Sequence, residues 1–103
     1  MAQFDVYRLS DAEEARSLLG QVEVGDGGQL KLLRAEPGAQ AALDRALADL
    51  NGRQGLALKL PPGPKHPKYA IVKKLIARDD PRFFEAIEDN LKRWHNMALS
   101  PAI

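Results

Sequence analysis

The chain has 103 residues, of which 45% are hydrophobic and 28% are charged, with a formal net charge of +1 and no cysteine. This composition is typical of one globular domain, and we expect a single α+β domain over residues 1–103. The lack of cysteine excludes disulfides, thiol nucleophiles and thiolate metal sites, and it fits a reducing compartment.

The longest uninterrupted apolar run, residues 69–72, is far too short to span a membrane. The N-terminus shows no basic start followed by an apolar stretch, which a signal peptide requires. We therefore expect a cytoplasmic protein with no membrane partner.

The first elements are predicted as a strand followed by a helix. Residues 4–9 are rich in β-forming side chains with roughly alternating polarity. Ser10 and Glu13 have the spacing of a capping box, and the apolar residues after them share one helical face. Gly20 is expected to end this helix.

The next stretch is predicted as a hairpin, a second helix and a further strand. Residues 22–24 form a short strand at a sheet edge, 25–28 a turn, and 30–35 the partner strand. The apolar residues of 39–50 lie on one helical face, and 56–60 alternate as a half-buried strand. Gly25–Gly28 could also cradle an anion with backbone N–H groups, but a turn is the preferred interpretation.

The remaining residues are predicted to add two helices. A proline-rich loop over 61–67 leads into a helix over 69–78, and a second helix begins after Asp79 and Asp80, whose charges favour a helix N-terminus. Residues 99–103 are expected to be a flexible tail. The predicted fold is α+β, a ferredoxin-like split βαβ (βαββαβ) sheet with two additional C-terminal helices.

The most informative feature is the distribution of charge. Residues 1–51 contain five basic and nine acidic residues, net −4, whereas 52–103 contain ten basic and five acidic residues, net +5. Between Asp49 and Asp79 there is no acidic residue at all. The basic residues in this interval are Arg53, Lys59, Lys65, Lys68, Lys73, Lys74 and Arg78. Such an asymmetry predicts an anionic partner.

The basic segment over 59–78 is the predicted anion-binding or nucleic-acid-binding site. Lys65 and Lys68 are expected at the N-terminus of the helix over 69–78, where cations are locally unfavourable unless an anion is bound. The other candidates would extend the positive surface or stack on a base. The candidate residues are Lys65, His66, Lys68, Tyr69, Lys73, Lys74 and Arg78. The alternative is a solvated surface whose lysines only keep the protein soluble.

The sequence contains no catalytic signature, so we do not expect an enzyme. His66 and His95, the two histidines, have neither a nucleophile partner nor the spacing of metal ligands. Adjacent carboxylates such as Asp79 and Asp80 are better explained by helix N-termini. No catalytic residue, metal site or cofactor is predicted.

Phe83 and Trp94 widen the apolar stripe of the last helix beyond what one small sheet covers. They form the predicted interaction surface. The alternative is a large apolar face that packs on the sheet or against the preceding helix. Two functions therefore stay open. The first is a small non-enzymatic binding module that binds nucleic-acid backbone or an acidic protein through 59–78. The alternative is a protein-interaction or homo-oligomeric module that uses the last helix and a sheet edge.

Overall fold

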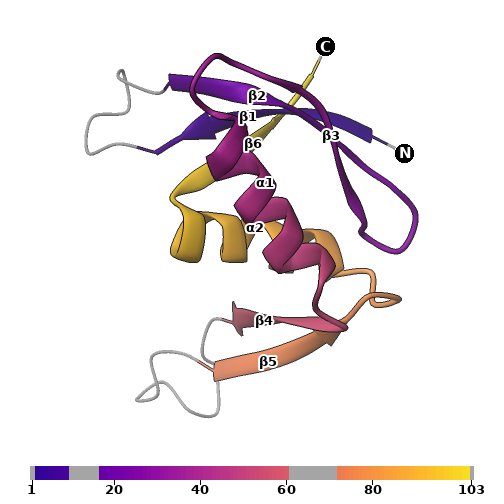
Figure 1. Ribbon diagram of the computed structural model, residues 1–103. Coiled ribbons are helices and arrows are strands. Elements are labelled where there is room, and N and C mark those ends of the chain that lie inside the picture. The colour runs from indigo at the N-terminus through magenta and orange to yellow at the C-terminus, as the bar shows by residue number, and fades with distance from the viewer. Residues whose placement is uncertain (1, 10–16, 61–71, 103) are drawn as a thin grey trace.

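The computed structural model describes residues 2–9, 17–60 and 72–102, which form six strands and two helices (Figure 1). In chain order the elements are β1 (Ala2–Arg8), β2 (Ser17–Val24), β3 (Leu30–Ala35), α1 (Gln40–Asn51), β4 (Gly55–Leu60), β5 (Val72–Ala77), α2 (Phe83–His95) and β6 (Met97–Pro101). An antiparallel four-stranded sheet has the order β3-β2-β1-β6. The other two strands form an antiparallel pair, which we call the β4–β5 ribbon.

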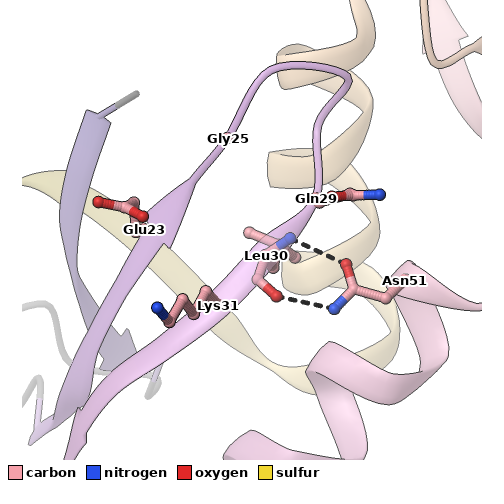
Figure 2. A pocket seen from close by; sticks show the side chains of 6 residues that line it. All are labelled: Glu23, Gly25, Gln29, Leu30, Lys31 and Asn51. Atoms are coloured by element: carbon pink, nitrogen blue, oxygen red, sulfur yellow. Dashed lines mark hydrogen bonds between the residues drawn. The ribbon is translucent and has the colours of Figure 1, made fainter.

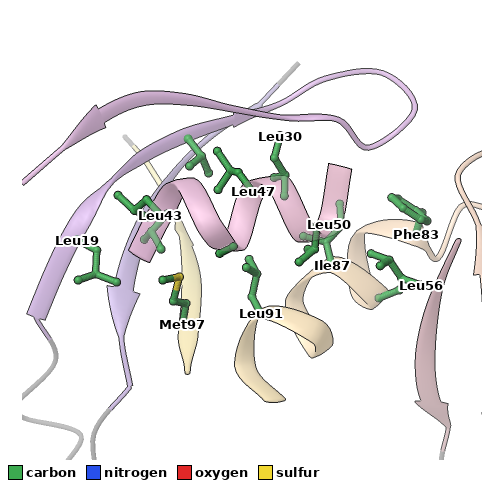
Figure 3. Packing of buried hydrophobic residues seen from close by; sticks show 14 of the residues in the cluster. Leu19, Leu30, Leu43, Leu47, Leu50, Leu56, Phe83, Ile87, Leu91 and Met97 are labelled. Atoms are coloured by element: carbon green, nitrogen blue, oxygen red, sulfur yellow. The ribbon is translucent and has the colours of Figure 1, made fainter. Parts of the chain in front are cut away.

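The two helices lie between the four-stranded sheet and the β4–β5 ribbon (Figure 1). One apolar cluster joins all three layers, because it contains Leu19 of the sheet, Leu47 of α1, Ile87 of α2 and Leu56 of the ribbon (Figure 3). The predicted helix over 39–50 is confirmed as α1, and the predicted strand over 56–60 is confirmed as β4. The ribbon therefore packs against the helices, which separate it from the four-stranded sheet (Figure 1).

The hairpin predicted over residues 22–35 is confirmed by the pairing of β2 with β3. The turn closes where the Gly25 N–H donates to the Gln29 carbonyl at 2.8 Å. Gly28 lies at φ +77°, and a Cβ atom there would approach ring carbons of Phe83 to 2.3 Å. Glycine is therefore required at this position, both for the backbone conformation and for packing of the turn on α2.

Asn90 is the buried polar residue that ties α2 to the ribbon. It is 6% exposed, and its side-chain amide donates to the carbonyl of Ala57 on β4 at 2.7 Å and to that of Ala86 at 2.8 Å. A buried amide must be hydrogen-bonded to avoid a desolvation penalty. The geometry therefore specifies how the ribbon sits against α2.

The predicted ferredoxin-like layout with two additional C-terminal helices is wrong. The described residues contain two helices, and the segments predicted as helices over 10–19 and 69–78 are not helical where they are described. Residues 17–24 form β2, because this segment pairs with β1 on one side and with β3 on the other. The capping-box residues Ser10 and Glu13 lie outside the described residues.

The segment 72–77 is a strand because its pairing with β4 determines its conformation. Ile76 lies opposite Leu56 and is fully buried, while its neighbours Leu75 and Ala77 are exposed. This alternation has the period of a strand. The same apolar residues also fit a short helix, and a single short run does not distinguish the two.

Two smaller predictions also need correction. Residues 99–101, the start of the expected flexible tail, belong to β6, which pairs with β1 and sets Leu99 opposite Val6. Residues 22–24 belong to β2, which is an interior strand of the sheet, so they offer no free edge. The helix predicted after Asp79 and Asp80 is confirmed as α2.

Candidate functional site

The predicted anion-binding residues fall into three groups. Lys65, His66, Lys68 and Tyr69 lie outside the described residues. Lys73 and Lys74 belong to β5, and Arg78 follows it. Because 72–77 is a strand, the predicted helix N-terminus at Lys65 and Lys68 no longer has a basis.

The β4–β5 ribbon brings two lysine positions directly opposite each other. Lys59 of β4 is the register partner of Lys73 on β5, and Lys74 is the partner of Leu58. The Lys74 side chain is exposed. Like charges on directly opposite positions destabilise an antiparallel pair, and neither strand contains an acidic residue to offset them. The ribbon therefore brings basic positions of both strands together. The sequence showed only that basic residues follow one another without an acidic one.

Arg78 has a structural role that sequence analysis missed. Its guanidinium group lies 5.2 Å from the ring centroid of Phe83. Its Nε, Nη1 and Nη2 groups donate to backbone carbonyls at distances from 2.6 to 3.3 Å, and the acceptors are Gly27, Leu50, Asn51 and Arg53. These contacts satisfy carbonyls at the C-terminal end of α1, where a cation is also favoured by the helix dipole. We therefore do not place Arg78 in an anion site.

The two residues of the predicted interaction surface, Phe83 and Trp94, differ in exposure. Phe83 is 4% exposed and packs against Gly28 and Arg78, whereas Trp94 is 67% exposed near the other end of α2. The apolar stripe of α2 turns Phe83, Ile87 and Leu91 into the core, so Trp94, and not Phe83, is exposed to a partner.

Asp49 and His95 form a pair that the sequence did not reveal, because they are separated by 46 positions. His95 Nε2 lies 2.8 Å from Asp49 Oδ2, and Asp49 Oδ1 accepts from Arg53 at 2.9 and 3.0 Å. The hydrogen bond from His95 is the largest cause that holds the pKa of Asp49 below its ordinary value of 3.8, and Arg53 acts in the same direction. The pair links α1 to the end of α2.

A cleft of about 460 Å³ lies between the β2–β3 hairpin and the end of α1 (Figure 2). Its main polar group, the Asn51 side chain, is already used, because it accepts from the Leu30 N–H and donates to the Leu30 carbonyl, both at 2.8 Å. Glu23 and Lys31, also in its wall, are register partners on neighbouring strands. These contacts hold α1 against the start of β3, so we interpret the cleft as structural.

Within the described ranges, no group of three or more His, Asp or Glu side chains is placed to hold a metal ion. Neither α1 nor α2, with 12 and 13 residues, is long and apolar enough to cross a membrane. The chain matches no family model, no curated protein and no solved structure. A functional assignment must therefore come from the chemistry of its own residues.

We expect the replacement Arg78→Gln to lower the free energy of unfolding by about 2 kcal/mol, because several carbonyls lose a charged donor. Lys74→Gln, which removes an exposed charge from the adjacent strand, should change it by less than about 0.5 kcal/mol. Urea denaturation of both variants measures the difference. Equal stability of the two variants would contradict the structural role of Arg78.

Asp49 should contribute to a pH dependence of stability. Its pKa is lowered in the folded state, so its contribution is present above pH 3.8 and is lost as the pH falls through the lowered folded value. Asp49→Asn should reduce the free energy of unfolding by about 1–2 kcal/mol near neutral pH, and the difference from the wild type should shrink in acid. Denaturation between acid and neutral pH measures this. Asp44→Asn, on the exposed side of α1, is the control and should not reproduce the pattern.

Proposed function

We propose that this protein is a non-enzymatic binding module that binds nucleic-acid backbone through the β4–β5 ribbon. The observation that carries the proposal is the register of the ribbon, which sets Lys59 opposite Lys73 with Lys74 beside them. The sequence contains no acidic residue between Asp49 and Asp79. A phosphate backbone would offset the repulsion between these charges.

The shape of the ribbon supports a duplex partner. A two-stranded antiparallel ribbon has dimensions that the major groove of B-DNA accepts. Lysine provides a compact charge without fixed directionality, which suits contacts with phosphate and not with base edges. The contacts should be independent of sequence and should weaken strongly with salt.

The residues between the two strands would add to this site. Lys65, His66, Lys68 and Tyr69 belong to the connection from β4 to β5 and stay candidates on sequence grounds. Arg78 is left out because backbone carbonyls occupy its donor groups. A cytoplasmic location, which the absence of cysteine favours, would give the ribbon access to nucleic acid. The proposal involves no cofactor.

A second candidate function is self-association or docking with another protein, an acidic one if the lysines take part. It is favoured by Leu75, which is 72% exposed on β5 although it is a large apolar residue. Within the described residues, β4 and β5 each pair on one side only. An unpaired edge can accept a strand from a partner. Light scattering over a concentration series would detect a homo-oligomer, and Leu75→Thr should weaken it.

The triple variant Lys59→Gln, Lys73→Gln, Lys74→Gln tests the nucleic-acid proposal. We expect the wild type to bind a labelled DNA duplex with a dissociation constant of roughly 10⁻⁴–10⁻⁶ M at physiological salt. The triple variant should bind at least about tenfold more weakly, and its logarithmic salt slope should be smaller by about 2–3, because each phosphate contact contributes nearly one. Fluorescence anisotropy at several salt concentrations measures both quantities.

A matched control removes three positive charges elsewhere. Lys31→Gln, Arg34→Gln, Lys92→Gln changes the net charge equally, at exposed positions of β3 and α2. This control should keep most of the affinity and the wild-type salt slope. Equal losses in both triple variants would show a dependence on net charge alone. No binding by the wild type at low salt would reject the proposal.

A further inference from the structure

A second cleft lies where three distant segments meet, and its chemistry differs from that of the ribbon. It has a volume of about 310 Å³, and the residues that line it include Arg8, Arg45, Trp94, His95, Asn96 and Met97. We call it the Trp94 cleft. Its size is at the lower end of the range for small-molecule sites. It lies between the end of β1, the first half of α1 and the junction of α2 with β6.

Trp94 provides an aromatic surface beside a buried apolar residue. Its side chain is 67% exposed, although Met97 in the same cleft is 2% exposed. Covering an exposed aromatic ring with another flat ring lowers the free energy, because apolar surface is removed from water. Stacking of a nucleic-acid base on an aromatic side chain is a common way to do so.

Arg8 and Arg45 make the Trp94 cleft positive. The ion pairs of the described residues use Arg34, Arg53, Arg82 and Arg93, and Arg78 binds backbone carbonyls. Among the described contacts, neither Arg8 nor Arg45 pairs with a carboxylate. α1 begins near the cleft and α2 ends there, so the two helix ends present partial charges of opposite sign to it. The positive charge of the cleft therefore comes from the two guanidinium groups. Arginine binds phosphate in a bidentate geometry.

The wall of the Trp94 cleft is held in place by hydrogen bonds. The Leu9 N–H donates to the Asn96 carbonyl, and the Asn96 side-chain amide donates to the Leu9 carbonyl, both at 2.9 Å. Asn96 ends α2 in the left-handed conformation, at φ 55°. The end of β1, and with it Arg8, is thereby fixed beside the end of α2. A site that is formed before binding loses less entropy when a ligand enters.

His95 adds an imidazole ring of fixed orientation to the wall of this site. Its side chain is 13% exposed, and its Nε2 is bonded to Asp49, whose other oxygen is held by Arg53. The hydrogen bond to Asp49 fixes the orientation of the imidazole ring in the wall of the cleft. The charge of Asp49 is shared between two partners, which reduces its repulsion of an anion in the Trp94 cleft.

We propose that the Trp94 cleft binds a nucleotide, with the base stacked on Trp94 and the phosphate between Arg8 and Arg45. The ligand is free or is one unit of a single strand, because both present the same flat base and charged phosphate. This site is independent of the β4–β5 ribbon, which lies on the other side of α2 from the four-stranded sheet (Figure 1).

Trp94 is the sole tryptophan of the chain, so its fluorescence reports directly on the cleft. The protein is titrated with adenosine 5′-monophosphate, adenosine, inorganic phosphate and a short single-stranded oligonucleotide. A saturable change with the monophosphate, at least about tenfold tighter than with adenosine or phosphate, is the expected result. A response to the oligonucleotide alone would identify a nucleotide within a strand as the ligand. If neither the monophosphate nor the oligonucleotide gives a saturable response, the proposal is overturned.

Variants assign the response to the cleft. Arg8→Gln and Arg45→Gln should each weaken binding about tenfold, because each removes a charged hydrogen bond to phosphate. Arg34→Gln, an exposed arginine of β3, should bind as the wild type does. Thermal unfolding checks that each variant is folded. Arg45→Lys retains the positive charge and should therefore bind more tightly than Arg45→Gln. Unchanged affinity in both glutamine variants would overturn the proposed phosphate position.

The same titration separates this site from the ribbon. The variant Lys59→Gln, Lys73→Gln, Lys74→Gln should bind the monophosphate as tightly as the wild type does. Trp94→Leu, followed by calorimetry, should lose monophosphate binding and keep the salt-dependent binding of duplex DNA. A loss of monophosphate binding in the ribbon variant would contradict a separate site.

Discussion

The contacts of the Arg78 guanidinium group join several elements of this protein to one another. They connect the C-terminal end of α1, the β2–β3 turn and the start of α2 with the end of β5. Terminal carbonyls of a helix lack partners within the helix, and a planar group with several donors can satisfy several of them together. Asn90 provides the second tie, between α2 and β4. Together these contacts hold the β4–β5 ribbon against α1 and α2.

The two proposed sites use different kinds of positive charge because they meet their ligands differently. The ribbon carries lysines, whose charge is compact and strongly hydrated, and this suits salt-dependent contacts with a backbone. The Trp94 cleft combines Arg8 and Arg45 with an aromatic ring, and this suits a ligand held in one orientation. Arg78 belongs to neither site, although its sequence position suggested the first. An arginine in a basic run can therefore be a structural residue, and only its hydrogen bonds distinguish the two roles.

Where the sequence predictions succeeded, the signal was local. The Gly25–Gln29 turn and α1 could be predicted because glycine at positive φ and an apolar stripe with helical spacing each depend on a few neighbouring residues. The predictions failed for 17–19 and 72–77, where apolar residues fit a helix and a strand equally well. Pairing with a distant strand decided the conformation of both segments. The expectation of a basic binding region survives in the ribbon as a proposal. Its original reason, a helix N-terminus, does not.

The β2–β3 hairpin, α1, α2 and the concentration of lysines between Asp49 and Asp79 could all be derived from the sequence without a structure. Three facts came from the fold alone: Lys59 lies opposite Lys73, Arg78 binds backbone carbonyls, and Arg8, Arg45 and Trp94 line one cleft. These facts concern residues far apart in the chain. Strand register and helix packing bring them together, and both depend on the whole set of long-range contacts and not on any local pattern of residues.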